Sequence, residues 1–313
     1  MSQRISSILA QRPDFPVGID NTMRSAFILC PRKFAYSFLH NLIPKGDENV
    51  HLFAGACFAK GLEVARMAYY NNNQSAEHSL MIGMLALTEA WGTYEPPTGH
   101  VKSYINMLGA LVSYLDYWPF DHDTLIPVQS AIGPMVEFTF AIPLEGTKHP
   151  QTGEPIIYFG RADMIGELGL SSRLNFVVDE KTTQRLGPTW GAQWELRAQM
   201  SGYVWAARQH GYEVEGAIIR GISILKDSYG HAEVITYRPK WEIARWYNQL
   251  IRDVNRMIRC WEEGYWDYNF DSGCALFRKC DFMSLCDVEN PEQWLADYEQ
   301  KKWDPMGISE GED

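Results

Sequence analysis

The chain has 313 residues and a mass of 35.9 kDa, and 46% of its residues are apolar and 13% aromatic. It can therefore bury a substantial core and is not a disordered tail protein. Because 21% of the residues are charged and no apolar run approaches the roughly 18 residues that cross a bilayer, we expect a soluble chain. The first residues lack the apolar stretch of a signal peptide, so we expect a cytoplasmic protein.

The net charge of −11 gives no support to a polyanionic partner. The acidic residues concentrate after Cys286, however, and the part of the chain before it is nearly balanced. Such a body can carry a local basic groove. Composition therefore does not exclude a nucleic-acid partner.

Helical spacing dominates the first third of the chain. Apolar residues recur every three or four positions in four segments, which we expect to be helices: 25–39, 55–70, 76–91 and 101–117. Pro44, Pro96 and Pro97 lie between these segments. We expect residues 1–125 to form a helical N-terminal region.

From residue 126 the pattern changes to short runs of β-branched and aromatic residues separated by Gly, Asn and Ser. These runs predict three antiparallel strands, a helix, two further strands and a long helix: 136–142, 156–168, 175–182, 192–210, 216–225, 232–237 and 240–264. This order predicts the α/β or α+β class. We expect a core domain over 126–240, a long helix with a cysteine-bearing segment over 241–290, and an acidic tail over 291–313.

Two acidic residues lie at the ends of apolar strands. Asp163 follows Gly160-Arg-Ala, and Asp179 closes Phe176-Val-Val, with Lys181 two residues later on the same face of the strand. If the two strands pair, two carboxylates converge beside one ammonium, a set that suits hydrolysis with a divalent metal. An exposed ion pair between Asp179 and Lys181 is the alternative.

The helix expected over 192–210 carries Gln199 and Tyr203 four residues apart, with Glu195 one turn earlier on the same face. An amide and a hydroxyl beside a metal site can position a phosphate or a base. Alternatively, Tyr203 packs in the core of an amphipathic helix.

The segments 160–163, 179–183 and 199–203 read Gly-Arg-Ala-Asp, Asp-Glu-Lys-Thr-Thr and Gln-Met-Ser-Gly-Tyr. In order and spacing the chain resembles the PD-(D/E)XK nuclease superfamily, in particular its RecB-like branch with a Gln-x-x-x-Tyr motif, which includes CRISPR-associated and phage-type exonucleases. The resemblance implies an α/β (α+β) fold with a restriction-endonuclease-like core. It also implies a metal-dependent DNA nuclease, an exonuclease rather than an endonuclease. The implied catalytic residues are Asp163, Asp179, Lys181, Gln199 and Tyr203, and the implied ligands of Mg²⁺ or Mn²⁺ are Asp163, Asp179 and the main-chain carbonyl of Glu180.

The resemblance extends to four cysteines. The segment 25–36 is similar to the opening helix of these domains, whose cysteine is paired in the family with three near the C-terminus. It therefore implies an iron-sulfur cluster, of the 4Fe-4S type, held by Cys30, Cys274, Cys280 and Cys286. A zinc site with the same ligands, or unliganded buried thiols, remain alternatives. We expect the other two cysteines, Cys57 and Cys260, to lie in the core.

One position departs from the family pattern. The segment 55–63 resembles a Gly-x-x-x-His helix, but Ala59 stands where the metal-binding histidine is expected. Either the remaining ligands form a weaker site, or the chain is a catalytically weak or inactive nuclease fold that binds nucleic acid or a protein partner.

The implied substrate is DNA, single-stranded or at duplex ends, in recombination, repair or phage DNA processing. If the chain is encoded by a phage, its location is the host cytoplasm. We expect a basic surface for this substrate to draw on six residues: Arg32, Lys33, Arg161, Arg197, Arg238 and Lys240.

Overall fold

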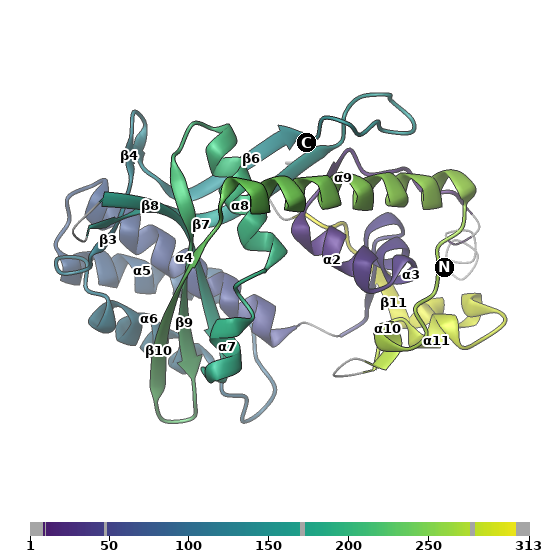
Figure 1. Cartoon of the computed structure of the whole chain (residues 1–313). Helices are drawn as coiled ribbons and strands as arrows, with labels where there is room; N and C mark the ends of the chain where they lie inside the picture. The colour runs from purple at the N-terminus through teal and green to yellow at the C-terminus, as the bar shows by residue number, and fades with distance from the viewer. Residues whose placement is uncertain (1–8, 10, 47–48, 170–172, 276–278, 305–313) are drawn as a thin grey trace, which may run out of the picture. The chain divides into compact units, whose positions relative to one another are not determined.

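The computed structural model describes residues 9, 11–46, 49–169, 173–275 and 279–304 (Figure 1). Its contacts divide the chain into two compact units, and each combines segments that are distant in the sequence. The first unit contains residues 1–47, 140–160 and 245–313, and the second contains residues 48–139 and 161–244. Three elements pass from one unit into the other: β6 (Val136–Pro143), β7 (Ile157–Gly169) and α9 (Lys240–Glu263). The domain boundaries expected from the sequence stay a prediction.

Three helices begin the second unit: α4 (Val50–Tyr70), α5 (Ala76–Trp91) and α6 (Tyr104–Tyr117). The prediction for 76–91 is confirmed to the residue, and the other two helices differ from prediction only at their starts. Polar caps explain these starts, since the side chains of Asn49, Ser75 and Ser103 each accept hydrogen bonds from N–H groups of the first turn. Helices α4 and α5 approach closely at Gly61, where an added Cβ would lie 2.9 Å from the carbonyl oxygen of Gly83.

A mixed sheet forms the centre of the second unit. The strand order is β7, β8 (Arg173–Thr183), β9 (Val214–Ile224) and β10 (Tyr229–Tyr237). Strands β7 and β8 are antiparallel, β8 and β9 are parallel, and β9 and β10 are antiparallel. Strands β6 and β3 (Leu125–Pro127) also pair with β7, and β4 (Gln129–Ser130) pairs with β5 (Gly133–Pro134). The predicted α/β class is confirmed.

Helices cover both faces of this sheet (Figure 1). On one face, Ile222 and Ile224 of β9 pack in one apolar cluster with residues of α4, α5 and α6. On the other face lie α7 (Pro188–Ala192) and α8 (Ala198–Gln209). A Cβ at Gly221 would lie 2.4 Å from the ring of Trp190 in α7, so this strand position requires glycine.

The single helix predicted over 192–210 is wrong in its first part. Helix α8 begins at Ala198, and the residues before it form turns. Arg238 is buried beneath these turns, and its Nη2 donates to the carbonyl oxygen of Trp194 at 2.7 Å. Glu195 therefore does not share a helical face with Gln199.

Helices α2 (Asn21–Leu29), α3 (Pro31–Phe34) and a π-helix (Ala35–Leu39) belong to the first unit. The continuous helix predicted over 25–39 is wrong at Cys30, which is extended with φ −164° and ψ 114° because it precedes a proline. Arg24 of α2 and Asp253 of α9 form a buried ion pair at 2.7 Å. None of the helices in the described ranges combines the length and apolar character needed to cross a membrane.

The remaining elements of the first unit are short. Strand β1 (Gly18–Ile19) runs parallel to the start of β7, and β2 (Leu42–Pro44) pairs with β11 (Tyr298–Gln300). Helices α10 (Ser272–Ala275) and α11 (Met283–Cys286) carry two of the C-terminal cysteines. A 3-10 helix (Pro291–Asp297) and β11 occupy the beginning of the segment expected to be an acidic tail, so this part is folded.

Candidate active site

Pairing of β7 with β8 brings the acidic residues together. The antiparallel register ends with Met164 opposite Val178, so Asp163 and Asp179 are the next residue on each strand. Asp163 Oδ2 accepts a hydrogen bond from the Glu180 N–H at 2.6 Å. Lys181 Nζ lies 2.5 Å from Asp179 Oδ2. The two carboxylates and the ammonium therefore form one cluster at the end of the strand pair.

The cluster is short of positive charge. Asp179 is only 2% exposed. Burial raises the pKa of Asp163 well above its usual range, and the charges of Glu180 and Asp179 raise it further. Burial also raises the pKa of Asp179, although the charge of Lys181 opposes this. Burial lowers the pKa of Lys181, but the charges of Asp179 and Asp163 outweigh burial and raise it. A cation placed between the carboxylates would relieve their repulsion.

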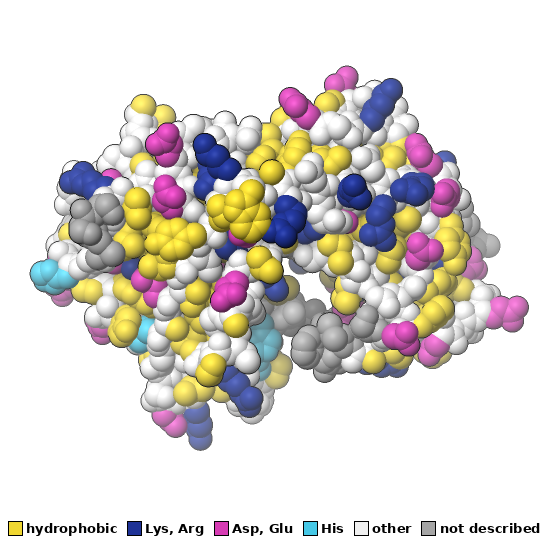
Figure 2. All heavy atoms as spheres, in the orientation of Figure 1, with side chains coloured by type: hydrophobic (Ala, Val, Ile, Leu, Met, Phe, Trp, Pro, Cys, Tyr) yellow, Lys and Arg dark blue, Asp and Glu magenta, His cyan; other side chains and the backbone are white. Residues whose placement is uncertain are grey.

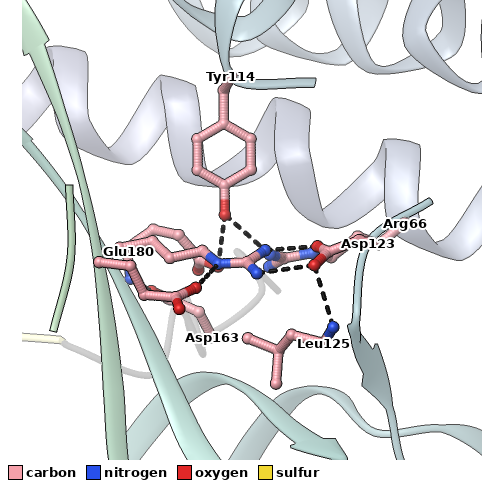
Figure 3. A network of polar contacts seen from close by, with 8 residues as sticks. Arg66, Tyr114, Asp123, Leu125, Asp163 and Glu180 are labelled. Atoms are coloured by element: carbon pink, nitrogen blue, oxygen red, sulfur yellow. Dashed lines mark hydrogen bonds and ion pairs between the residues drawn. The ribbon is translucent and has the colours of Figure 1, made fainter. Parts of the chain in front are cut away.

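Glu180 points to the face of β8 opposite to Asp179 and Lys181, and its carboxylate also interacts with Asp163 (Figure 3). Its Oε1 lies 2.5 Å from Arg66 Nη2 of α4 and accepts a hydrogen bond from the Tyr114 hydroxyl of α6 at 3.2 Å. Burial raises the pKa of Glu180, but the charge and hydrogen bond of Arg66 outweigh burial and lower it. Beside this pair, Arg220 of β9 binds Asp123 with two hydrogen bonds (Figure 3). This network fixes β8 against the helices.

A cavity of about 620 Å³ opens beside the cluster. Ala59 of α4 lines this cavity together with Asp163 and Glu180. The alanine lies at the site, but its methyl group offers no donor to a metal. In the part of the chain that the structure describes, no three His, Cys, Asp or Glu side chains are already arranged to hold a metal ion. The oxygen donors of the cluster are the carboxylates of Asp163 and Asp179 and the main-chain carbonyl of Glu180.

Gln199 and Tyr203 lie on one face of α8, where Gln199 Nε2 donates to the Tyr203 hydroxyl at 2.8 Å. Helix α8 packs on β8 and β9. The charge of Arg197, at the start of α8, lowers the pKa of Asp179, so this end of the helix lies near the carboxylates. The tyrosine is itself mostly buried.

The prediction that Arg238 belongs to a basic substrate surface is wrong. Its side chain is only 1% exposed, and it donates to the Ser201 hydroxyl and to main-chain oxygens of Trp194 and Tyr237. It holds α8 and the turns before it, so it is not available to a substrate. Arg161 lies partly exposed beside Glu137 at 3.4 Å.

The four cysteines expected to hold a cluster all lie in the first unit. Cys30 separates α2 from α3, and the Cys280 N–H donates to the carbonyl oxygen of Cys274 at 3.1 Å. Burial raises the pKa of Cys286 to about 12, and the charges of Cys280, Cys30 and Cys274 add to this effect. The thiols therefore lie in one region of the unit, but within the described ranges no three of them are arranged as metal ligands. Of the other two cysteines, Cys57 is in the core as predicted, whereas Cys260 is only partly buried.

Sequence reasoning missed three residues of the site: Arg66, Tyr114 and Lys102. Arg66 lies seven residues after Ala59, two helical turns along the same face, so its place near the site was open to inference from the helical period. Tyr114 and Lys102 come from the α6 region, some 65 to 80 residues from β8 in sequence. No local pattern indicates which strand they contact.

Comparison with known proteins identifies the family of the chain. The family model of the PD-(D/E)XK nuclease superfamily matches residues 24–287. No curated protein matches the chain. One solved structure that matches is described as "Crystal structure of SSO0001"; it is 14% identical, covers 74% of this chain and 84% of that chain, and has a TM-score of 0.30. That similarity is too low to bear on function.

Proposed function

The chain belongs to the PD-(D/E)XK nuclease superfamily, whose members act on nucleic acid and usually use Mg²⁺ or Mn²⁺, and from this premise we propose that it is a metal-dependent deoxyribonuclease. The observation that carries the proposal is the excess of buried negative charge at Asp163 and Asp179. Among the residues that the structure describes, the partly exposed Lys181 is the one that lies close enough to Asp179 to form an ion pair with it.

In this proposal, Asp163, Asp179 and the main-chain carbonyl of Glu180 hold the metal. Oxygen donors of this kind suit Mg²⁺ and Mn²⁺. When bound, the ion would polarise the scissile phosphate and the attacking water. The ammonium of Lys181, beside Asp179, orients that water and offsets negative charge that develops on the phosphate. Gln199 and Tyr203 contact the substrate strand from α8.

The finer proposal is an exonuclease of the RecB-like type that acts in DNA recombination, repair or phage DNA processing. The Gln-x-x-x-Tyr motif on a helix that packs beside the carboxylates supports it. Digestion of linear duplex and single-stranded DNA, with covalently closed circular DNA as the matched substrate without ends, tests the exonuclease. Loss of linear DNA alone is expected, and equal cutting of circles would replace the exonuclease with an endonuclease.

Ala59 favours a second candidate, a weak or inactive nuclease fold that binds nucleic acid. The alanine lines the cavity at the position where a histidine ligand is expected. Binding of DNA without cleavage in Mg²⁺ or Mn²⁺ would identify this candidate. Cleavage that depends on Asp179 would exclude it.

We also propose that Cys30, Cys274, Cys280 and Cys286 hold an iron-sulfur cluster. The thiols influence one another's pKa, and all six cysteines of the chain are free. Four thiolates suit a 4Fe-4S cluster, which would join α2 to the C-terminal segment. Protein purified without oxygen should be brown and lose its colour on Cys280→Ser but not on Cys57→Ser. Stoichiometric zinc without iron would show that the four cysteines form a structural zinc site instead.

The long helix α9 offers a surface for the substrate backbone within the first unit. Arg252, Arg256 and Arg259 are exposed at helical spacing and line a shallow hollow of about 350 Å³ with Gln249 and Asn255. Figure 2 shows several Lys and Arg side chains gathered over this helix. We propose that these arginines contact phosphates of the DNA. Arg252→Glu should weaken DNA binding, and Lys148→Glu, an exposed charge reversal elsewhere in the unit, should not.

A further inference from the structure

The cavity beside the carboxylates has a second wall that the proposed chemistry does not use. Its lining includes Asp163, Glu180 and Lys181, which belong to the strand pair, and also His51 and Lys102. Thr182 of β8 lines the cavity as well. With a volume of about 620 Å³, the cavity is in the range of pockets that hold small ligands.

Lys102 is buried with only neutral partners. Its side chain is 1% exposed, and Nζ donates to Thr182 Oγ1 at 2.7 Å and to the Thr182 carbonyl oxygen at 3.2 Å. No Asp or Glu among the residues described forms an ion pair with it. Burial lowers the pKa of Lys102 to about 8. An ammonium has three N–H donors, and the two oxygens of Thr182 accept from only two of them. The third donor is therefore left without an acceptor, and the positive charge is left without a counter-charge.

Two histidines lie near Lys102: His51 lines the same cavity, and His100 contacts the main chain of Lys102. The rings of His51 and His100 lie 5.1 Å apart, and the Lys102 N–H donates to His100 Nδ1 at 3.1 Å. That hydrogen bond places the proton of a neutral His100 on Nε2, where it is a donor. Burial lowers the pKa of His51, and the charges of Lys102 and His100 lower it further. Lys102 and the two histidines therefore offer hydrogen-bond donors and a positive charge, and no described Asp or Glu forms an ion pair with Lys102.

An unpaired buried cation destabilises a folded protein, and an apolar side chain of the same length would pack there without that penalty. Such a residue is explained when the partner of its charge is a ligand. The ligand must be an anion, and it must fit a cavity that is also lined by Asp163 of the proposed metal site. A phosphate of the nucleic-acid strand meets both conditions.

We propose that Lys102, with His51 and His100, binds a backbone phosphate of the substrate strand adjacent to the scissile one. The proposal rests on the proposed nuclease function for the identity of the ligand. In this arrangement, the strand enters the cavity with one phosphate beside Asp163 and a neighbouring phosphate at the Lys102 ammonium.

The test is the binding of a short single-stranded oligonucleotide in EDTA, measured by fluorescence anisotropy over a range of salt concentrations. Lys102→Met should weaken binding by about tenfold, because one charge-assisted contact is lost. It should also reduce the slope of log affinity against log salt by about 0.7, the value for one phosphate contact on a single strand. Lys226→Met removes an exposed lysine from the turn between β9 and β10 and should change neither quantity.

A melting temperature separates this role from a structural one. Lys102→Met should melt at or above the wild-type temperature, because a buried charge has been removed. Lys102→Gln, which keeps a hydrogen-bond donor for Thr182 without the charge, should lose the same part of the salt slope. Wild-type binding and slope in both variants would overturn the proposal, and so would loss of folding in both.

Failure of this inference can be told apart from failure of the nuclease function. Oligonucleotide binding in EDTA involves no cleavage, so the Lys102 contact can be demonstrated in a protein that never cuts DNA. Conversely, Asp179-dependent cleavage with unchanged binding in Lys102→Met would leave the nuclease function standing and refute the phosphate contact.

Discussion

Two buried cations, Arg66 and Lys102, approach the same face of β8, and their partners there differ in charge. At the Glu180 end, Arg66 meets a carboxylate at 2.5 Å and a tyrosine hydroxyl, and its pKa is raised because the charge of Glu180 outweighs burial. At the Thr182 end, Lys102 meets only neutral oxygens, and burial lowers its pKa to about 8. The first cation has its counter-charge within the fold and is structural. The second has no counter-charge among the described residues and lines a cavity, which is what a ligand-binding group requires.

Substitution of Arg66 is expected to cause the largest change in the free energy of unfolding. Arg66→Met leaves the Glu180 carboxylate buried without its partner, so the free energy of unfolding should fall by about 3–5 kcal/mol. Urea denaturation measures this change. Lys60→Met, which removes an exposed ion pair with Glu63 on the same helix, should change it by less than about 1 kcal/mol. Equal effects of the two variants would show that the Glu180 end is not held by its ion pair.

The opposite sign is expected at Lys102. Below pH 8 its buried ammonium is charged in the folded protein, and the lowered pKa corresponds to a destabilisation of up to about 3 kcal/mol. Lys102→Met should therefore be at least as stable as the wild type at pH 7. As the pH rises from about 8 toward the unfolded value near 10.5, the wild type loses this penalty and the difference should shrink.

Urea denaturation of both proteins at pH 7 and at about pH 9.5 checks this prediction, because the shared titration of other groups cancels in the difference. A variant less stable than the wild type at pH 7 would mean that Lys102 is a structural residue like Arg66.

A smaller effect is expected at Tyr114. Its hydroxyl donates to Glu180 at 3.2 Å and accepts from Arg66 at 3.2 Å, so Tyr114→Phe removes two hydrogen bonds and leaves the ion pair intact. The loss in unfolding free energy should be about 2 kcal/mol, measured in urea. A loss as large as that of Arg66→Met would show that the hydroxyl, rather than the guanidinium, satisfies Glu180.

The smallest effect is expected at Ala59, which lines the cavity between the two ends. Ala59→His adds an imidazole donor beside Asp163, so cleavage should reach half of its maximum at a lower Mn²⁺ concentration. Ala59→Gln, similar in length but a poorer ligand, is the matched control. Identical Mn²⁺ titrations for wild type and both variants would show that this helix position does not reach the metal.

Local patterns predicted the strands that carry Asp163 and Asp179, because alternation and apolar runs depend only on neighbouring residues. The break at Cys30 was open to prediction from the proline that follows it. The turns before α8 were not, since they depend on Arg238, a residue more than 40 positions away that is buried beneath them. Arg238 was itself placed on the surface, because its charge is visible in the sequence and its burial is not. Lys102 carries no signal at all until the fold places it beside Thr182.

The most direct test of the central claim is the rate at which labelled linear DNA is degraded by the wild type, by Asp179→Asn and by Asp116→Asn, with Mn²⁺ or with EDTA. Asp179 lies in the buried cluster, whereas Asp116 is an exposed acid on α6. We predict that the wild type and Asp116→Asn degrade the DNA only with metal, and that Asp179→Asn is slower by about a hundredfold or more. Degradation by Asp179→Asn at the wild-type rate, or degradation that continues in EDTA, would contradict the assignment of this cluster as the active site.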